Sequence, residues 1–119
     1  MAICETCLHR AVCGKYKATG GVNKCEHNKE KRQGVYERLL QRYGAQLQSV
    51  VALEELSECQ KEICKFLRGK GDIDHLAEEV ADATIMLEQI RHIYNLDKKV
   101  DQYIEEKVQR TVDRLEETT

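Results

Sequence analysis

Two pairs of acidic residues, each pair spaced three residues apart, most constrain what this chain can fold into. The first pair is Glu55 and Glu58, and the second is Glu79 and Asp82. Both pairs lie in segments with helical periodicity, in which residues i and i+3 share one helix face. The glycine-containing segment 68–72 can turn the second helix back against the first. The four carboxylates should then meet, and such a group needs a cation to offset its mutual repulsion.

The kind of cation follows from the ligand atoms and from their surroundings. Several carboxylate oxygens without nitrogen or sulfur favour Mg²⁺ or Mn²⁺ over zinc. The segment around Asp82 is apolar almost all round, which predicts a buried helix; its apolar residues are Val80, Ala81, Ala83, Ile85, Met86, Leu87 and Ile90. Carboxylates on a buried helix need partners. The alternative is that these acids lie on a solvated face, as most helical glutamates do.

The pattern ExxE followed about twenty residues later by ExxD, on paired helices, resembles the MazG-like all-α nucleoside triphosphate pyrophosphohydrolases. The resemblance extends from about Tyr43 to the C-terminus, and the segment 43–48 is similar to the lead-in to the first catalytic helix of that family. It implies an all-α antiparallel helical bundle. It also implies hydrolysis of a nucleoside triphosphate between the α and β phosphates, giving a monophosphate and pyrophosphate.

The composition predicts a soluble helical protein. Hydrophobic residues make up 41% and charged residues 34% of the chain, with no proline or tryptophan, and the formal net charge of −2 argues against a nucleic-acid binder. No run approaches the ~18 apolar residues of a membrane span, and the N-terminus lacks the apolar core of a signal peptide. We therefore expect a cytoplasmic protein with reduced thiols.

Residues 1–30 form a separate cysteine-rich region with little apolar material. Four cysteines in this region could hold one structural zinc ion; they are Cys4, Cys7, Cys13 and Cys25. His27 could replace one of them, and disulfides or free thiols are alternatives. We therefore expect a zinc-binding module at 1–30 and a helical catalytic domain at 31–119.

The helical domain should contain a short helix and three long ones. The short helix carries Val35, Leu39 and Leu40 and ends near Tyr43, and the long ones are expected over about 46–68, 73–94 and 97–117. Cys59 and Cys64 are expected in the core, and His75 and His92 in structural roles. Glu62, one turn beyond Glu58, either binds a second ion, orients the attacking water or lies at the surface.

The last helix should bury a stripe formed by Val100, Ile104, Val108, Thr111 and Leu115. A basic row of Lys107, Arg110 and, as a weaker candidate, Arg114 borders this stripe. Such a row can grip phosphates; the alternative is ordinary pairing with Glu105, Glu106 or Asp113. The resemblance favours a lysine and an arginine here.

We expect the bundle to be completed by a homodimer or homotetramer, because one chain would leave the apolar second helix uncovered. The predicted function is Mg²⁺- or Mn²⁺-dependent hydrolysis of (deoxy)nucleoside triphosphates, in nucleotide-pool house-cleaning. Base and sugar contacts are assigned to Gln46, Gln48 and Asn95 because these residues are near the acidic helices in sequence. The alternative is a non-catalytic zinc-binding interaction module on a helical dimerisation platform.

Overall fold

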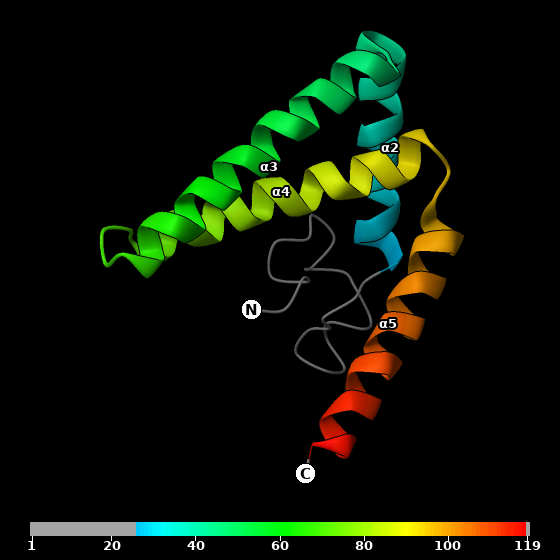
Figure 1. Cartoon of the computed structure of the whole chain (residues 1–119). Helices are drawn as coiled ribbons and strands as arrows, with labels where there is room; N and C mark the ends of the chain where they lie inside the picture. The colour runs from blue at the N-terminus through cyan, green and yellow to red at the C-terminus, as the bar shows by residue number, and fades with distance from the viewer. Residues whose placement is uncertain (1–25, 119) are drawn as a thin grey trace, which may run out of the picture. The chain divides into compact units, whose positions relative to one another are not determined.

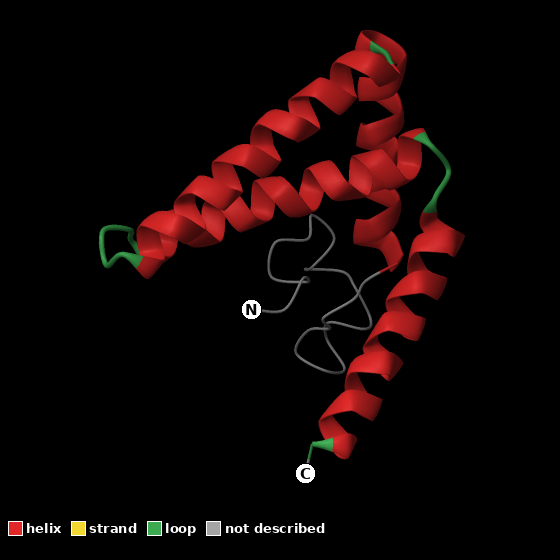
Figure 2. Cartoon of the chain, viewed as in Figure 1, coloured by secondary structure: helices red, strands yellow, loops and turns green. Residues whose placement is uncertain are grey.

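The structure, a computed structural model, describes residues 26–118 of the chain (Figures 1 and 2). Within this range every regular element is an α-helix, as the all-α prediction requires. The elements are α2 (Glu26–Tyr43), α3 (Ala45–Leu67), α4 (Ile73–Ile93) and α5 (Asp97–Glu117). Among these residues no helix is long and apolar enough to cross a membrane.

Helix α2 is longer than the sequence predicted. It begins at Glu26, so the charged segment 29–32 continues the helix, and α2 crosses the expected boundary between residues 30 and 31. Gly44, with φ of 85°, ends it in a conformation that side-chain-bearing residues rarely adopt. The predicted zinc ligands Cys4, Cys7, Cys13 and Cys25 lie outside the described residues, so the zinc module stays a prediction.

Helices α3 and α4 pack side by side as an antiparallel hairpin (Figure 1). The turn at 68–72 contains Gly69 at φ 75°, and Asp72 caps α4 by accepting a hydrogen bond of 2.8 Å from the Asp74 N–H. The predicted bounds of both helices are confirmed to within about a residue. The hairpin therefore places the two acidic segments opposite each other.

Helix α5 begins after a left-handed residue, Asn95, with φ of 54°. Arg91 of α4 ties the start of α5 to the hairpin. Its guanidinium donates hydrogen bonds to carboxylate oxygens of Asp97 at 2.7 Å and Asp101 at 2.6 Å. Beyond this anchor α5 leads away from the hairpin in Figure 1.

Most of the buried residues of α3 and α4 are small or polar, and Met86 is the one large apolar side chain among them. They recur at helical spacing on the faces that carry Glu55 and Asp82: Gln48, Ala52 and Glu62 on α3, and Ala83, Met86 and Gln89 on α4. We call this contact the α3–α4 interface. Ala52 and Ala83 carry single methyl groups, which lets the two backbones approach.

The large apolar residues lie mostly outside this interface. Leu53 is 65% and Leu67 79% exposed, and Val80, Ile85 and Leu87 are exposed as well. One chain therefore leaves the second acidic helix largely uncovered, as expected of a single copy, and its burial by a second copy stays a prediction. Cys64 is exposed rather than in the core, whereas Cys59 is partly buried.

Helix α5 has no buried residue in the described structure. Of its expected stripe, Val100 is partly covered, whereas Ile104, Val108, Thr111 and Leu115 are exposed. The stripe shares one face, as its spacing predicted, but one chain does not bury it, and its burial in an assembly stays a prediction.

Candidate functional site

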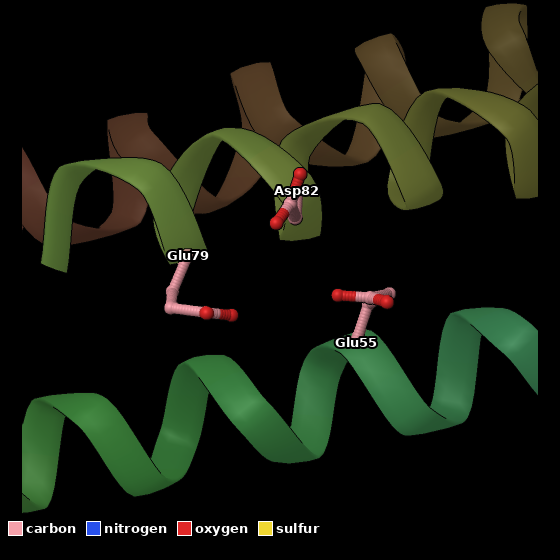
Figure 3. Close-up of side chains that lie close together, drawn as sticks. All are labelled: Glu55, Glu79 and Asp82. Carbon is pink, nitrogen blue, oxygen red and sulfur yellow. The ribbon is translucent and has the colours of Figure 1, made fainter. Parts of the chain in front are cut away.

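Three carboxylates converge between α3 and α4 (Figure 3). Glu55 comes from α3, and Glu79 and Asp82 come from α4; the three side chains point toward one another. One ligand atom from each lies within 4.8 Å of the others, and all three residues are partly buried. This is a spacing at which one cation can contact all three carboxylates.

Local sequence explains how these side chains reach the same place. Glu79 and Asp82 lie one turn apart and therefore share a face of α4. Ala83, directly after Asp82, is buried, as is Ala52, one turn before Glu55. Small residues beside the acids bring the helices close enough for short carboxylate side chains to meet.

Burial and mutual repulsion disfavour the charged form of these carboxylates. Partial burial raises the pKa of the Glu55 carboxyl above its usual range, and the negative charges of Asp82, Glu79, Glu58 and Glu54 raise it further. Glu79 is only 16% exposed, and its Oε2 atom is buried without a hydrogen-bond partner among the described residues. Burying a carboxylate oxygen without a partner is costly, and a cation beside it would offset that cost.

Glu58, the fourth predicted ligand, lies outside this group. Its side chain is 54% exposed, and its carboxylate lies 3.6 Å from the Lys61 ammonium one turn further along α3. Its charge still contributes to the raised pKa of Glu55. The structure therefore brings together three of the four predicted carboxylates and leaves Glu58 beside them, facing solvent.

A buried acid that the sequence did not identify as buried lies two turns beyond Glu55. Glu62 is only 4% exposed, so the surface alternative for this residue is wrong. Its carboxylate contacts His75 of α4, whose imidazole lies in turn near Glu79. The signal was present in the sequence, because a residue seven positions from Glu55 returns to nearly the same helix face.

The predicted base and sugar contacts occupy three different environments. Gln46 and Asn95 are exposed, whereas Gln48 is buried. Gln48 precedes Glu55 by seven residues, and the buried Gln89 follows Asp82 by seven, so each lies two turns from the acids on the same face. The Gln89 Oε1 atom has no hydrogen-bond partner in the described structure. The substrate roles of Gln46, Gln48 and Asn95 stay predictions.

The predicted phosphate-binding row lies on α5. Lys107, Arg110 and Arg114 are exposed, and Arg110 lines an open hollow with acidic neighbours that include Glu106 and Asp113. Within residues 26–118 neither Lys107 nor Arg110 makes an ion pair. The structure does not bring this row to the three carboxylates within one chain, and its phosphate role stays a prediction.

Comparison with known proteins adds no relative. No family model matches the chain, and neither a curated protein nor a solved structure matches it.

Proposed function

We propose that the chain is a cytoplasmic, Mg²⁺- or Mn²⁺-dependent nucleoside triphosphate pyrophosphohydrolase of the MazG-like type. The observation that carries this proposal is the convergence of Glu55, Glu79 and Asp82 from two helices onto one point. The same residues belong to the ExxE and ExxD pattern on which the resemblance rests. The antiparallel α3–α4 hairpin provides the helical pairing that the resemblance implies.

The three residues suit a hard divalent cation. They offer oxygen ligands alone, which favours Mg²⁺ or Mn²⁺. The unpartnered Glu79 Oε2 and the raised pKa of Glu55 both reflect negative charge without an adjacent counter-charge. When bound, Mg²⁺ supplies polarisation of the phosphate oxygens and lowers the pKa of a bound water. Glu55, Glu79 and Asp82 would hold it there.

Glu58 is the residue that we assign to proton acceptance. It lies one turn from Glu55, outside the three metal-binding carboxylates and open to solvent. The water oxygen forms a bond to the α phosphorus, the bond from that phosphorus to the bridging oxygen breaks, and pyrophosphate leaves. Glu58 accepts the proton that the water loses. No Walker-type phosphate loop is present in the sequence, so binding depends on side chains.

The remaining parts of the site are assigned to α5 and to a second copy of the chain. Lys107 and Arg110 offset charge that develops on the phosphate oxygens. The exposed apolar residues of α3, α4 and α5 support an oligomer that completes the bundle, in which a second copy would bring this row to the carboxylates. The structural role of zinc at residues 1–30 belongs to the same proposal.

Release of pyrophosphate from a panel of canonical and damaged nucleoside triphosphates, with and without Mg²⁺, tests the proposal. We expect Mg²⁺-dependent release with at least one nucleotide. Glu79→Gln and Asp82→Asn should each lower kcat/KM more than about a hundredfold, since both remove a metal ligand. Glu78→Gln is the matched control, because Glu78 adjoins Glu79 but its side chain is 74% exposed. Equal activity of Glu79→Gln and Glu78→Gln would contradict the site.

A second candidate is a non-catalytic helical platform for association, favoured by the exposed apolar residues of α3, α4 and α5. On that reading the zinc module would bind the partner. The two candidates differ in one result: a platform releases no pyrophosphate with any nucleotide in the panel, with or without Mg²⁺.

A further inference from the structure

Glu62 is a buried acid that the metal-binding carboxylates do not include. It lies on the α3–α4 interface, about 10 Å along α3 from Glu55 at 1.5 Å per residue. A carboxylate that is 4% exposed is costly unless nearby groups compensate its charge. Its surroundings therefore indicate what it does.

An imidazole, an ammonium group and a glycine surround this carboxylate. The Glu62 Oε2 atom lies 3.5 Å from Nε2 of His75 on α4 and 3.8 Å from the Lys65 ammonium on its own helix. A Cβ atom added at Gly71 would lie 3.3 Å from Glu62 Oε1 and 3.0 Å from the Phe66 backbone nitrogen. The turn backbone therefore packs closely over Glu62, which holds the carboxylate against α4.

His75 connects this carboxylate to the candidate metal centre. The same Nε2 atom lies 3.8 Å from Oε1 of Glu79, one turn further along α4. With Oε1 facing the imidazole, Oε2 of Glu79 is the oxygen that lies buried without a partner. At these distances the contacts are electrostatic rather than hydrogen bonds, and they link Glu79 to Glu62 through the imidazole.

We propose that Glu62 and His75 are positioning residues for the metal centre: Glu62 holds the His75 imidazole, and the imidazole fixes Glu79 so that Oε2 faces the cation. Neither residue contacts substrate. This inference rests on the proposed metal centre and extends it by two residues. Groups that orient metal ligands from behind commonly change metal affinity ten- to a hundredfold when removed.

Mn²⁺ binding to the full-length protein without nucleotide, followed by electron paramagnetic resonance, tests this chain of contacts. We expect His75→Ala to weaken Mn²⁺ binding about tenfold or more. His75→Gln keeps an N–H donor near the position of Nε2 and should restore binding to within a few-fold of wild type. Glu78→Gln is the control, because it removes the exposed carboxylate 3.9 Å from the other imidazole nitrogen, Nδ1; it should leave Mn²⁺ affinity unchanged.

The double variant Glu62→Gln/His75→Ala shows whether the two residues act in series. If Glu62 acts through His75, the double variant binds Mn²⁺ about as weakly as His75→Ala alone. If the losses of Mn²⁺ affinity caused by Glu62→Gln and His75→Ala instead multiply in the double variant, Glu62 does not act through His75. A purely structural His75 predicts a lower melting temperature with Mn²⁺ affinity within twofold of wild type, which would also overturn the proposal.

Mn²⁺ binding and nucleotide hydrolysis are measured separately, so the positioning role and the proposed activity can fail independently. Wild-type protein that binds Mn²⁺ but hydrolyses no nucleotide refutes the pyrophosphohydrolase proposal, while the His75 variants still decide the positioning role. Wild-type protein that binds no Mn²⁺ at millimolar concentration refutes both. Where Mn²⁺ binding and hydrolysis are both present, His75→Ala should show a raised requirement for Mg²⁺ in turnover with little change in KM for nucleotide.

Discussion

In an isolated pair of helices, apolar side chains are expected between the helices and polar ones on the outside. The α3–α4 interface and the outer faces of the same helices show largely the reverse. The interface buries Gln48, Glu62 and Gln89, while Leu53 and Leu67 on the outer surface remain largely exposed. Burial of acids and amides is costly, and burial of leucines is favourable. The difference is the one that the proposed metal site and the proposed oligomer would produce, because the first needs acids between the helices and the second needs apolar outer faces.

The largest expected effect is on self-association of the chain, which tests whether the exposed apolar faces contact a second copy. In a symmetric dimer a substitution occurs twice. Replacing Leu53 by Lys should therefore cost about 3 kcal/mol or more of association free energy, or more than a hundredfold in the dimer dissociation constant. Sedimentation velocity measures it. Gln60→Lys, at an exposed polar position of the same helix, is the control. A wild-type monomer at micromolar concentration would contradict the role given to the outer faces.

The basic row on α5 tests whether the outer surface also contributes to the site. If the proposed phosphate role holds, Lys107→Ala and Arg110→Ala should each lower kcat by about a hundredfold, because each would remove a charge-assisted contact to the phosphates. Arg114→Ala, one turn further along, is the internal comparison. Steady-state kinetics with thermal melts distinguish this role from surface ion pairing. Ion pairing predicts unchanged kinetics and a stability change of at most about 1 kcal/mol.

The smallest effect concerns the charge held at the interface itself. Because the pKa of Glu55 is raised in the folded state, the folded protein binds this proton more tightly than the unfolded chain does. Stability from this group therefore falls as pH rises from the ordinary value of 4.5 through the raised folded value, and rises again as pH is lowered. Glu55→Gln should melt slightly higher than wild type at pH 7, with the difference shrinking toward pH 4.5.

Metal provides the control for that measurement. Mg²⁺ at neutral pH should raise the melting temperature of the wild type, because it binds only the folded state. Mg²⁺ should raise the melting temperature of Glu55→Gln less, since this variant lacks one of the proposed ligands. A wild-type protein whose melting temperature ignores Mg²⁺, together with a Glu55→Gln variant that melts lower at pH 7, would contradict the electrostatic account of the interface.

Local sequence was sufficient for the bounds of three of the four described helices and for the grouping of Glu79 with Asp82, but not for the start of α2. The bounds of α3, α4 and α5 were predicted to within about a residue, because Gly44, Asp72 and Asn95 end or begin helices through local backbone geometry. The i, i+3 spacing also placed Glu79 and Asp82 on one face of α4. Helix ends and i, i+3 spacing depend only on residues that are close in the sequence, so they can be predicted from it directly.

Tertiary structure alone decided which acids the interface admits and which apolar residues it leaves outside. At about 100° per residue, Glu62 returns to within about 20° of Glu55 around the helix, whereas Glu58 lies about 60° away. Which of these directions faces α4 depends on the rotation and register that the 68–72 turn imposes, with Gly71 packed against Glu62. The seven-residue spacing shows that Glu62 shares a face with Glu55, but no local pattern says that this face is the one that meets α4. For this reason Glu58 was expected among the ligands and lies in solvent, while Glu62 is buried against His75.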